Sequence, residues 1–502
     1  MEDIKKQRKE TAIRFFTYGV MTIAIIVGVI ICAALSMGYR FDIWSGKISQ
    51  VALLQFNSYP RGATVSINND VQPGNTPNRA NTSMGDQTIK MELANYRTWQ
   101  KTLSLAPRTV KWLDYVRLIP NHIVTKPIQN IGKASDMVGS PDRKWLAIQP
   151  ASDSWEMSVL DVADVIKVKQ HNIKFDDTVV TRPQPNTPEQ FSIVEWDFSS
   201  QYLLVRHDVN NQPEYLLIDC RNKKDIKVTN INKLMPPEFN QITNVRFSGT
   251  SGETFYAINN GKLYLVNIKS QDSNILLADN VTSYAIYGNN KLAIVSRVTN
   301  SSNPNKVHQT VSLFTDSQLK PIRHYEDNVP TKAVVTSYNG QDYLFVARNN
   351  TVEIIPRPLD EHHETPTLSH NDSEDEGDKQ STIKPAHSMM GDKTLTWLQL
   401  SPNGRMIYSG YDNTTLVYDT ETKQVYRFDR KSNSTKLAFL DDYHIFDAVN
   451  NNIDIVEFDG TNRQTITSGH LPAMLSSNNK YIFSLSGDGD NVSLQQSKIV
   501  LD

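Results

Sequence analysis

The amino-acid sequence predicts an all-β exterior, made of a small β-sandwich and a seven- or eight-bladed β-propeller, with one N-terminal transmembrane helix. Three observations predict this fold class. An uncharged apolar run follows a basic N-terminal stretch, short alternating runs separated by turn residues fill 51–120, and a pattern of paired short strands recurs across 121–502.

Residues 15–38 are predicted to form the transmembrane helix. The 25 residues between Arg14 and Arg40 contain no Asp, Glu, Lys, Arg or His. As a helix rising about 1.5 Å per residue they span roughly 37 Å, enough to cross a hydrocarbon core of about 30 Å. Five Lys and Arg residues precede the run and only two follow closely. This bias predicts a cytoplasmic tail over 1–14 and an extracytoplasmic C-terminal part, joined to the helix by a linker over 39–50.

A cleavable signal peptide is the alternative for the same segment. The small residues Ala33, Ala34 and Ser36 close the apolar run, as they do ahead of a cleavage site. The apolar core of a signal peptide is typically about 7–15 residues, which is shorter than this run. Both interpretations export the rest of the chain.

Residues 51–120 are predicted to form a small antiparallel β-sandwich. Val65 and Ile67 alternate with polar neighbours, which indicates strands with one buried face. The strand-like runs are VALLQF (51–56), TVSIN (64–68), TIKMEL (88–93), TWQKTLSL (98–105) and VKWLDYVRLI (110–119).

The turns between these runs carry a family resemblance. The pattern consists of Tyr59-Pro60-Arg61-Gly62-Ala63, Gly74-Asn75-Thr76-Pro77 and Asn95-Tyr96 before a strand that contains Trp and Lys. It resembles the PEGA domain, a β-sandwich of exported and surface proteins. Arg61 departs from the family's glutamate, while Asn69 and Asn95 stand where glycines are usual, and Asn tolerates left-handed backbone angles. The resemblance implies a spacer or envelope-binding module and no catalytic activity.

Residues 121–502 are predicted to form the propeller. Successive units lie 37 to 63 residues apart, which fits blades of four strands with loop insertions. Eight units favour eight blades, with seven as the alternative, and IVTKPIQNI (123–131) is expected to supply the closing outer strand. The second strands of the units are KWLAIQP (144–150), QYLLVRH (201–207), ETFYAIN (253–259), NKLAIVS (290–296), DYLFVAR (342–348), RMIYSGY (405–411), DYHIFDA (442–448) and KYIFSLS (480–486).

Turn chemistry supports the propeller. Asn260-Gly261 lies between two strands, where a type I′ hairpin needs positive φ. Ser140-Pro141-Asp142 and Ser401-Pro402-Asn403 resemble the corner turns of TolB-like and WD40-like propellers. That likeness implies a fold rather than one activity.

Residues 358–393 are predicted to be a disordered acidic insertion. The segment has almost no large apolar residues and carries an acidic run over 372–378. It cannot bury enough surface to order itself. His362, His363 and His370 suggest a metal site, but a solvated loop is the preferred interpretation because metal ligands need a fixed scaffold.

Composition and motifs exclude several function classes. The net charge is −2 overall and −4 after the basic tail, so no basic face for nucleic acid is expected. Cys32 and Cys220 cannot form a disulfide framework, and Cys220 is predicted to be a small buried hydrophobe. No phosphate loop, G-x-S-x-G elbow, HExxH helix or paired CxxC is present.

The remaining acidic motifs do not change this conclusion. The segment SGDGDNVS (486–493) lacks the terminal glutamate of a calcium loop and is predicted to be a hairpin turn. The neighbours Asp441 and Asp442 are expected on opposite faces of a strand, which argues against an acid/base pair. No catalytic, cofactor-binding or metal-binding residue is therefore predicted, and no cofactor.

The preferred hypothesis is a non-enzymatic, single-pass membrane protein of the cell envelope that binds a protein or a cell-wall glycan through the propeller's loop face. One alternative is a hydrolase or lyase acting on polysaccharide or peptide, with residues that converge on the propeller channel. Another is a sensor or envelope assembly factor with a partner in the membrane. No nucleic-acid partner is expected.

Overall fold

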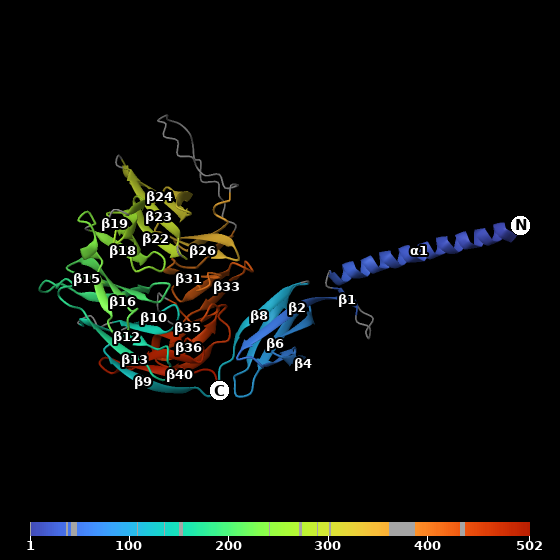
Figure 1. The fold of residues 1–502 in the computed structure, drawn as a ribbon, viewed down its shortest axis with the longest axis horizontal. Helices are drawn as coiled ribbons and strands as arrows, with labels where there is room; N and C mark the ends of the chain where they lie inside the picture. Colours follow the sequence, from blue (N-terminus) through green and yellow to red (C-terminus); the bar gives the residue numbers. More distant parts are fainter. Residues whose placement is uncertain are drawn as a thin grey trace, which may run out of the picture. The chain divides into compact units, whose positions relative to one another are not determined.

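A computed structural model shows a helix, a β-sandwich and a β-propeller. It describes residues 2–36, 39–41, 48–107, 109–134, 136–149, 154–239, 241–270, 274–288, 290–300, 303–360, 387–431 and 437–501. The chain divides into two compact units, Met1–His122 and Ile123–Asp502. Figure 1 labels the elements of both units.

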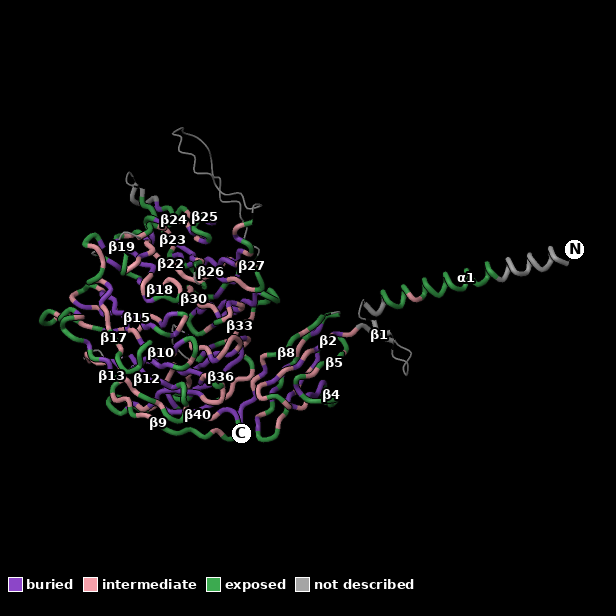
Figure 2. Tube along the Cα trace, in the orientation of Figure 1, coloured by how far each residue is buried: buried purple, intermediate pink, exposed green. Residues whose placement is uncertain are grey.

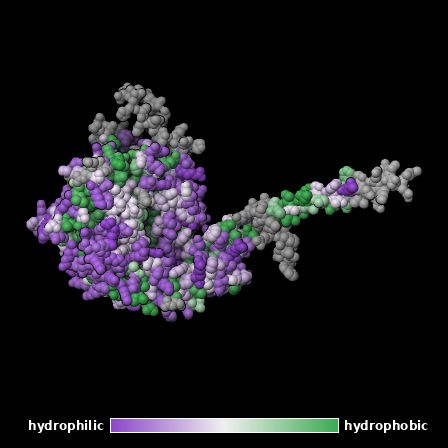
Figure 3. Space-filling model, in the orientation of Figure 1, coloured by the Kyte–Doolittle hydropathy of each residue, from purple (hydrophilic) through white to green (hydrophobic). Residues whose placement is uncertain are grey.

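The N-terminal helix α1 extends over Glu2–Ser36. Its segment Arg14–Ala33 has a mean hydropathy of 2.4 and is not buried against any other part of the structure. Figure 3 shows this apolar stretch, whereas the visible face of the propeller is mostly hydrophilic. The helix is long and apolar enough to cross a membrane, a property that an N-terminal signal sequence shares.

Two four-stranded sheets form the sandwich. In one, β2 pairs with β1, β5 and β8; in the other, the order is β4-β3-β6-β7. Between them lies a core that includes Leu54, Phe56 and the fully buried Trp99. The strands are β1 (Tyr39–Phe41), β2 (Ile48–Tyr59), β3 (Thr64–Ile67), β4 (Asp70–Asn75), β5 (Asn78–Ser83), β6 (Gly85–Glu92), β7 (Trp99–Leu105) and β8 (Val110–Arg117).

The sandwich corrects the sequence prediction at three points. β8 runs parallel to β2, because the chain crosses from one sheet to the other between β7 and β8. The predicted linker 39–50 contains β1 and the first residues of β2, which pair with each other. β4 and β5 were not predicted, because their mostly polar, exposed side chains give no alternating apolar signal.

Within the described residues, the second unit contains eight four-stranded sheets, which makes it an eight-bladed propeller. The predicted alternative of seven blades is therefore wrong. Blade 1 consists of β10 (Asp136–Gly139), β11 (Trp145–Gln149), β12 (Glu156–Asp161) and β13 (Lys169–Lys174), and blade 2 of β14 (Gln190–Trp196), β15 (Tyr202–Val209), β16 (Gln212–Asp219) and β17 (Lys227–Asn230). The 3-10 turn Asn232–Leu234 follows blade 2. Blade 3 consists of β18 (Ile242–Phe247), β19 (Thr254–Asn259), β20 (Lys262–Asn267) and β21 (Ile275–Ala278), and blade 4 of β22 (Val281–Tyr287), β23 (Lys291–Asn300), β24 (Asn303–Thr315) and β25 (Gln318–Tyr325).

The chain continues in the same direction through the other four blades. Blade 5 consists of β26 (Thr331–Tyr338), β27 (Gln341–Arg348), β28 (Thr351–Pro356) and β29 (His387–Met390), and blade 6 of β30 (Trp397–Leu400), β31 (Met406–Tyr411), β32 (Thr414–Asp419) and β33 (Val425–Asp429). Blade 7 consists of β34 (Ala438–Phe439), β35 (His444–Val449), β36 (Asn452–Glu457) and β37 (Gln464–Ser468), and blade 8 of β38 (His470–Leu475), β39 (Tyr481–Ser486), β40 (Val492–Lys498) and β9 (Val124–Gly132).

The ring closes where the two ends of the propeller segment meet. β9 forms the outer strand of blade 8 by pairing antiparallel with β40, as predicted for residues 123–131. Thr125 Oγ1 adds hydrogen bonds to Ser497 Oγ at 2.8 Å and Thr467 Oγ1 at 3.1 Å. In Figure 1 the colour runs once around the unit, from β9 to β40 beside it.

Hydrophobic cores between neighbouring blades hold the ring together. Blades 8 and 1 share a core that includes Met137, Met474 and Leu494, and blades 2 and 3 share one that includes Leu204 and Phe255. Figure 2 shows buried chain running through the blades and exposed chain at their turns. Each blade is thus an amphipathic sheet that is stable only against its neighbours.

The predicted insertion over 358–393 is too wide at its C-terminal end. His387–Met390 form β29 and pair with β28, which completes blade 5. Met389 is buried against this blade, and that contact orders a segment with few other apolar residues. The acidic run and His362, His363 and His370 lie outside the described residues.

Candidate binding site in the propeller channel

The first strands of the blades surround the axis of the propeller. β10 contacts both β14 and β38, while β26 contacts β22 and β30. The Gln399 side chain of β30 ties blade 6 to blade 7, because its Oε1 accepts the backbone N–H of Leu437 at 2.9 Å. These strands therefore line the central channel, and their outward-facing partners form the rest of each blade.

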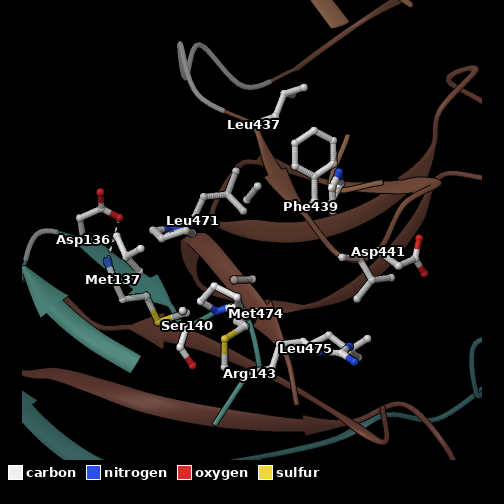
Figure 4. Close-up of a pocket in the computed structure, with 18 of the residues that line it drawn as sticks. Asp136, Met137, Ser140, Arg143, Leu437, Phe439, Asp441, Leu471, Met474 and Leu475 are labelled. Carbon is white, nitrogen blue, oxygen red and sulfur yellow. Dashed lines mark hydrogen bonds between the residues drawn. The ribbon is translucent and has the colours of Figure 1, made fainter. Parts of the chain in front are cut away.

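A cleft of about 820 Å³ opens in the channel between β10, β34 and β38. Figure 4 shows side chains from all three strands around it. Its volume falls in the range of about 300–1,000 Å³ that is typical of ligand pockets. The apolar lining consists of Met137, Val138, Pro141, Pro402, Leu437, Ala438, Phe439, Leu440, Leu471, Pro472, Ala473, Met474 and Leu475.

Local strand geometry makes room for this cleft. The pairing of β38 with β39 shifts register between His470 and Ala473, so Leu471 and Pro472 form a β-bulge. A bulge leaves residues unpaired and re-aims their side chains. Both bulged residues line the cleft. Gly139 of β10 supports the close packing, since a Cβ at that position would lie only 2.0 Å from the Met474 sulfur.

Three charged side chains lie at the end of the cleft formed by the turns that follow the inner strands. Arg143, Asp441 and Asp442 line this end. Arg143 Nη1 donates to Asn479 Oδ1 at 2.7 Å, which fixes the guanidinium beside blade 8. Two carboxylates against one guanidinium give this end of the cleft an acidic balance.

The two carboxylates have different surroundings. Asp441 Oδ1 accepts the backbone N–H of Tyr443 at 3.0 Å and that of His444 at 2.9 Å, and lies 2.8 Å from His444 Nδ1. Asp441 therefore shapes the turn. Burial and the charge of Asp441 raise the pKa of Asp442 above its usual value, while a backbone amide of Asn403 and the charge of Arg143 oppose the rise.

The corner turns bordering the cleft share one hydrogen-bond pattern. In blade 1, Ser140 Oγ donates to Asp142 Oδ1 at 2.6 Å and accepts the backbone N–H of Trp145 at 3.0 Å. Blades 6 and 8 repeat both bonds at Ser401 and Ser476. The buried serine and the acidic or amide residue two positions later thus hold each corner, which is the physical content of the predicted Ser-Pro-Asp and Ser-Pro-Asn turns.

Sequence reasoning missed this cleft. Asp441 and Asp442 were expected on opposite faces of a strand, but they lie in the turn before β35, and both line the cleft. The expectation failed because strand alternation does not apply in a turn. Segment 486–493 forms the β39–β40 hairpin, as predicted, with Ser486 paired to Ser493.

The other predicted positions have structural roles. Cys220 is buried in the core between blades 1 and 2, as predicted, and burial raises the pKa of its thiol to about 12. Asn260 and Gly261 have φ values of 50° and 75°, as the predicted hairpin requires. Within the described ranges, no group of three or more His, Cys, Asp or Glu residues could hold a metal ion.

The turns of the sandwich show the backbone angles that the family resemblance implied. Gly62 has φ 96° and Gly74 has φ 81°, and both Asn69 and Asn95 adopt left-handed angles of 72° and 69°. Residues 52–118 match the PEGA domain family. Asn69 and Asn95 therefore adopt, within the matched residues, the left-handed angle that the resemblance led us to expect at these turns.

Comparison with solved structures adds likenesses of low identity. The C-terminal WD40 domain of Sif2 is 10% identical, with a TM-score of 0.44, and covers 76% of this chain and 99% of its own. The Cps50 (Swd1) β-propeller domain of Myceliophteria thermophila is 11% identical, with a TM-score of 0.39, over 75% of this chain and 100% of its own. An oligogalacturonate lyase in complex with manganese is 9% identical, with a TM-score of 0.38, over 75% of this chain and 98% of its own. No curated protein matches the sequence.

Proposed function

We propose that this chain is a non-enzymatic, membrane-anchored binding protein of the cell envelope whose propeller takes up a segment of a protein partner. The observation that carries the proposal is the cleft of about 820 Å³ in the channel, apolar along its walls and acidic at one end. A rigid ring with a concave, mostly apolar site is suited to binding a peptide segment.

The chemistry of the cleft selects the occupant. Leu471 and Pro472, the half-buried residues of the bulge, offer aliphatic surface to an apolar side chain of the ligand. Phe439 offers an aromatic surface in the same cleft. Asp441 and Asp442 favour a cation, and the fitting occupant is therefore a peptide with an apolar residue next to Lys or Arg.

A selection from a random peptide library on the purified full-length chain tests this site. Wild type is expected to enrich peptides that pair apolar with basic residues. Asp442→Lys is expected to reduce the binding of those peptides at least tenfold, whereas Asp225→Lys, which changes an exposed carboxylate on blade 2, leaves it unchanged. Equal binding by wild type and Asp442→Lys would overturn the assignment.

The anchor is proposed to be α1, with its N-terminus in the cytoplasm. Arg14–Ala33 supplies 20 residues of mean hydropathy 2.4, and the basic residues lie on its N-terminal side. In cell fractionation, the chain should stay in the membrane after alkaline extraction and keep its original N-terminus. A soluble form with a new N-terminus near Ser36 would instead identify a signal peptide.

A second candidate function is hydrolysis of a polysaccharide or peptide in the same cleft. A specific observation favours it, since Asp442 lies in a cleft, has a raised pKa and neighbours the Asp441–His444 pair. Enzymes tune carboxyl groups in this way to act as acids near neutral pH. Turnover of a glycan or peptide panel by wild type, lost in Asp442→Asn, would establish this function in place of simple binding.

A further inference from the structure

The arc of the channel formed by blades 2, 3 and 4 contains a second pocket, of about 260 Å³. All three inner strands that border it carry a register shift. The shifts lie between Ile193 and Glu195 in β14, between Thr243 and Arg246 in β18, and between Val281 and Ser283 in β22. Bulges are over-represented beside functional sites, because they redirect side chains from the regular pleat.

Two guanidinium groups from neighbouring blades line this pocket, Arg206 of β15 and Arg246 of β18. Arg206 donates from Nε and Nη2 to Asp208 Oδ1, at 3.0 and 2.6 Å. Arg246 holds Glu195 Oε2 in the same way, with Nε at 2.7 Å and Nη2 at 2.6 Å. Each carboxylate therefore occupies one edge of its guanidinium.

Within the part of the chain that the structure describes, donors remain on the opposite edges. A guanidinium has five N–H groups in a planar fork, and neither of these carboxylates uses Nη1. Both side chains are close to 40% exposed, at 40% for Arg206 and 41% for Arg246, so a ligand in the channel can reach them. The paired carboxylates also limit the repulsion between the two cations.

Two tyrosines fix the pocket without adding charge. The Tyr284 hydroxyl donates to the backbone carbonyl of Tyr256 at 3.0 Å and to that of Asn244 in the bulge of β18. Burial raises the pKa of Tyr284 and of Tyr215. Both hydroxyls thus stay neutral at physiological pH and do not compete with an anion for the guanidinium groups.

We propose that the Arg206–Arg246 pocket binds a carboxylate group. Guanidinium groups bind carboxylates through planar, paired hydrogen bonds. Charge also favours a monoanion. Asp208 and Glu195 already balance the two cations, so a second negative charge on the ligand would have no further cation to offset it. The pocket belongs to blades 2 to 4, so this assignment does not depend on the cleft at blades 7, 8 and 1.

Saturation-transfer NMR on the full-length chain in detergent, with acetate as the probe at constant ionic strength, tests the pocket. Wild type should transfer saturation to acetate, and Arg206→Gln and Arg246→Gln should reduce the effect at least fivefold. Arg221→Gln is the matched control, since Arg221 is also held by a carboxylate two residues away, Asp219, on the outside of blade 2. Equal signals from wild type and both pocket variants would overturn the proposal.

A charge-conserving variant covers the case in which a glutamine variant fails to fold. Arg246→Lys keeps the cation but loses the planar fork, and we expect a weaker acetate signal from a protein that still shows a cooperative thermal unfolding transition. Inorganic phosphate serves as the competing probe. Displacement of acetate by phosphate at concentrations well below those of acetate itself would overturn the preference for a carboxylate.

Discussion

Two arcs of the propeller channel differ in size and in chemistry. Blades 7, 8 and 1 form a cleft of about 820 Å³ with apolar walls, three carboxylates and one guanidinium group, while blades 2 to 4 form a pocket of about 260 Å³ with two guanidinium groups. Both lie where an inner strand departs from regular pairing, in β38 on one side and in β14, β18 and β22 on the other.

The comparison indicates that bulges contribute to both sites without being shared by every strand that lines them, since β10 and β34 border the cleft and pair without a register shift. The inner strands β26 and β30 pair with their neighbours without a register shift, and no residue of either strand lines the cleft or the pocket. Eight similar blades supply a rigid ring, and bulges on particular blades then open space and redirect side chains. The two arcs should therefore respond separately to substitution.

The largest expected effect comes from the cores beneath the two arcs. Leu494 packs with Met137 and Met474 under the cleft, and Leu204 packs with Tyr215 and Val245 under the pocket. Both leucines are fully buried, so Leu494→Ala and Leu204→Ala should each lower the free energy of unfolding by about 2–5 kcal/mol, measured by urea denaturation.

Binding separates these two variants. Leu494→Ala is expected to weaken peptide binding at the cleft and to leave the acetate signal of the pocket unchanged, and Leu204→Ala should do the reverse. If each variant weakened both sites equally, the two arcs would be one cooperative unit, and the comparison would fail.

A smaller effect is expected from the ion pair that borders the pocket. Glu195 holds Arg246 and also accepts the backbone N–H of Phe247 at 2.8 Å, which ties blade 2 to blade 3. Glu195→Gln should lower the free energy of unfolding by about 1–3 kcal/mol, because a charge-assisted bond is lost. The same variant leaves the pocket with one more net positive charge, so acetate binding, measured by titration calorimetry, should strengthen severalfold. Unchanged acetate affinity would show that Arg246 does not contact the anion.

The corner turns give the next effect. Ser140→Ala removes a buried hydroxyl that accepts the Trp145 N–H, and should cost about 1–2 kcal/mol of unfolding free energy. Because Ser140 itself lines the cleft, peptide binding at the cleft should weaken. Thr254→Val is the control on the other arc, since it removes a comparable bond to the Ser248 carbonyl in blade 3. A loss of peptide binding in the control as well would mean that the two turns do not act locally.

Much of the architecture could be predicted from the sequence, because it depends on local patterns. The closing strand β9 is visible as a β-like run left over before the first repeat, and the turns at Asn69, Asn95 and Asn260 are visible as residues that accept positive φ. These signals come from a few neighbouring residues.

The candidate sites could not be predicted, because they depend on pairing between distant residues. A bulge such as Leu471–Pro472 is defined by the register with β39; Pro472 indicates an unpaired position because it has no backbone N–H, but it does not show which side chains the bulge turns toward the cleft. Arg206 and Arg246 are 40 positions apart and meet only because blades 2 and 3 are neighbours in the ring. The polar strand β5 was missed for a related reason, since only its pairing with β2 identifies it.

The smallest expected effect is at Asp442. Its raised pKa means that the folded protein holds the proton more tightly than the unfolded chain, so ionisation of Asp442 costs stability as pH rises from its ordinary value through the raised one. Asp442→Asn removes that cost. We expect the variant to match wild type at pH values low enough to protonate Asp442 in both states, and to be slightly more stable than wild type at pH 7, in denaturant titrations at a series of pH values.

The same titration affects binding with the opposite sign. Asp442 attracts a cationic peptide in its ionised form but not in its protonated form, so the peptide affinity of wild type should fall as pH drops through the raised pKa. The peptide affinity of Asp442→Asn should be lower and nearly independent of pH in that window. Acetate binding at the Arg206–Arg246 pocket should not follow this titration, because Asp442 is absent from its lining. A peptide affinity that is identical for both proteins at every pH would remove Asp442 from the site and leave Asp136 and Asp441 as the carboxylates of the cleft that could select a basic residue.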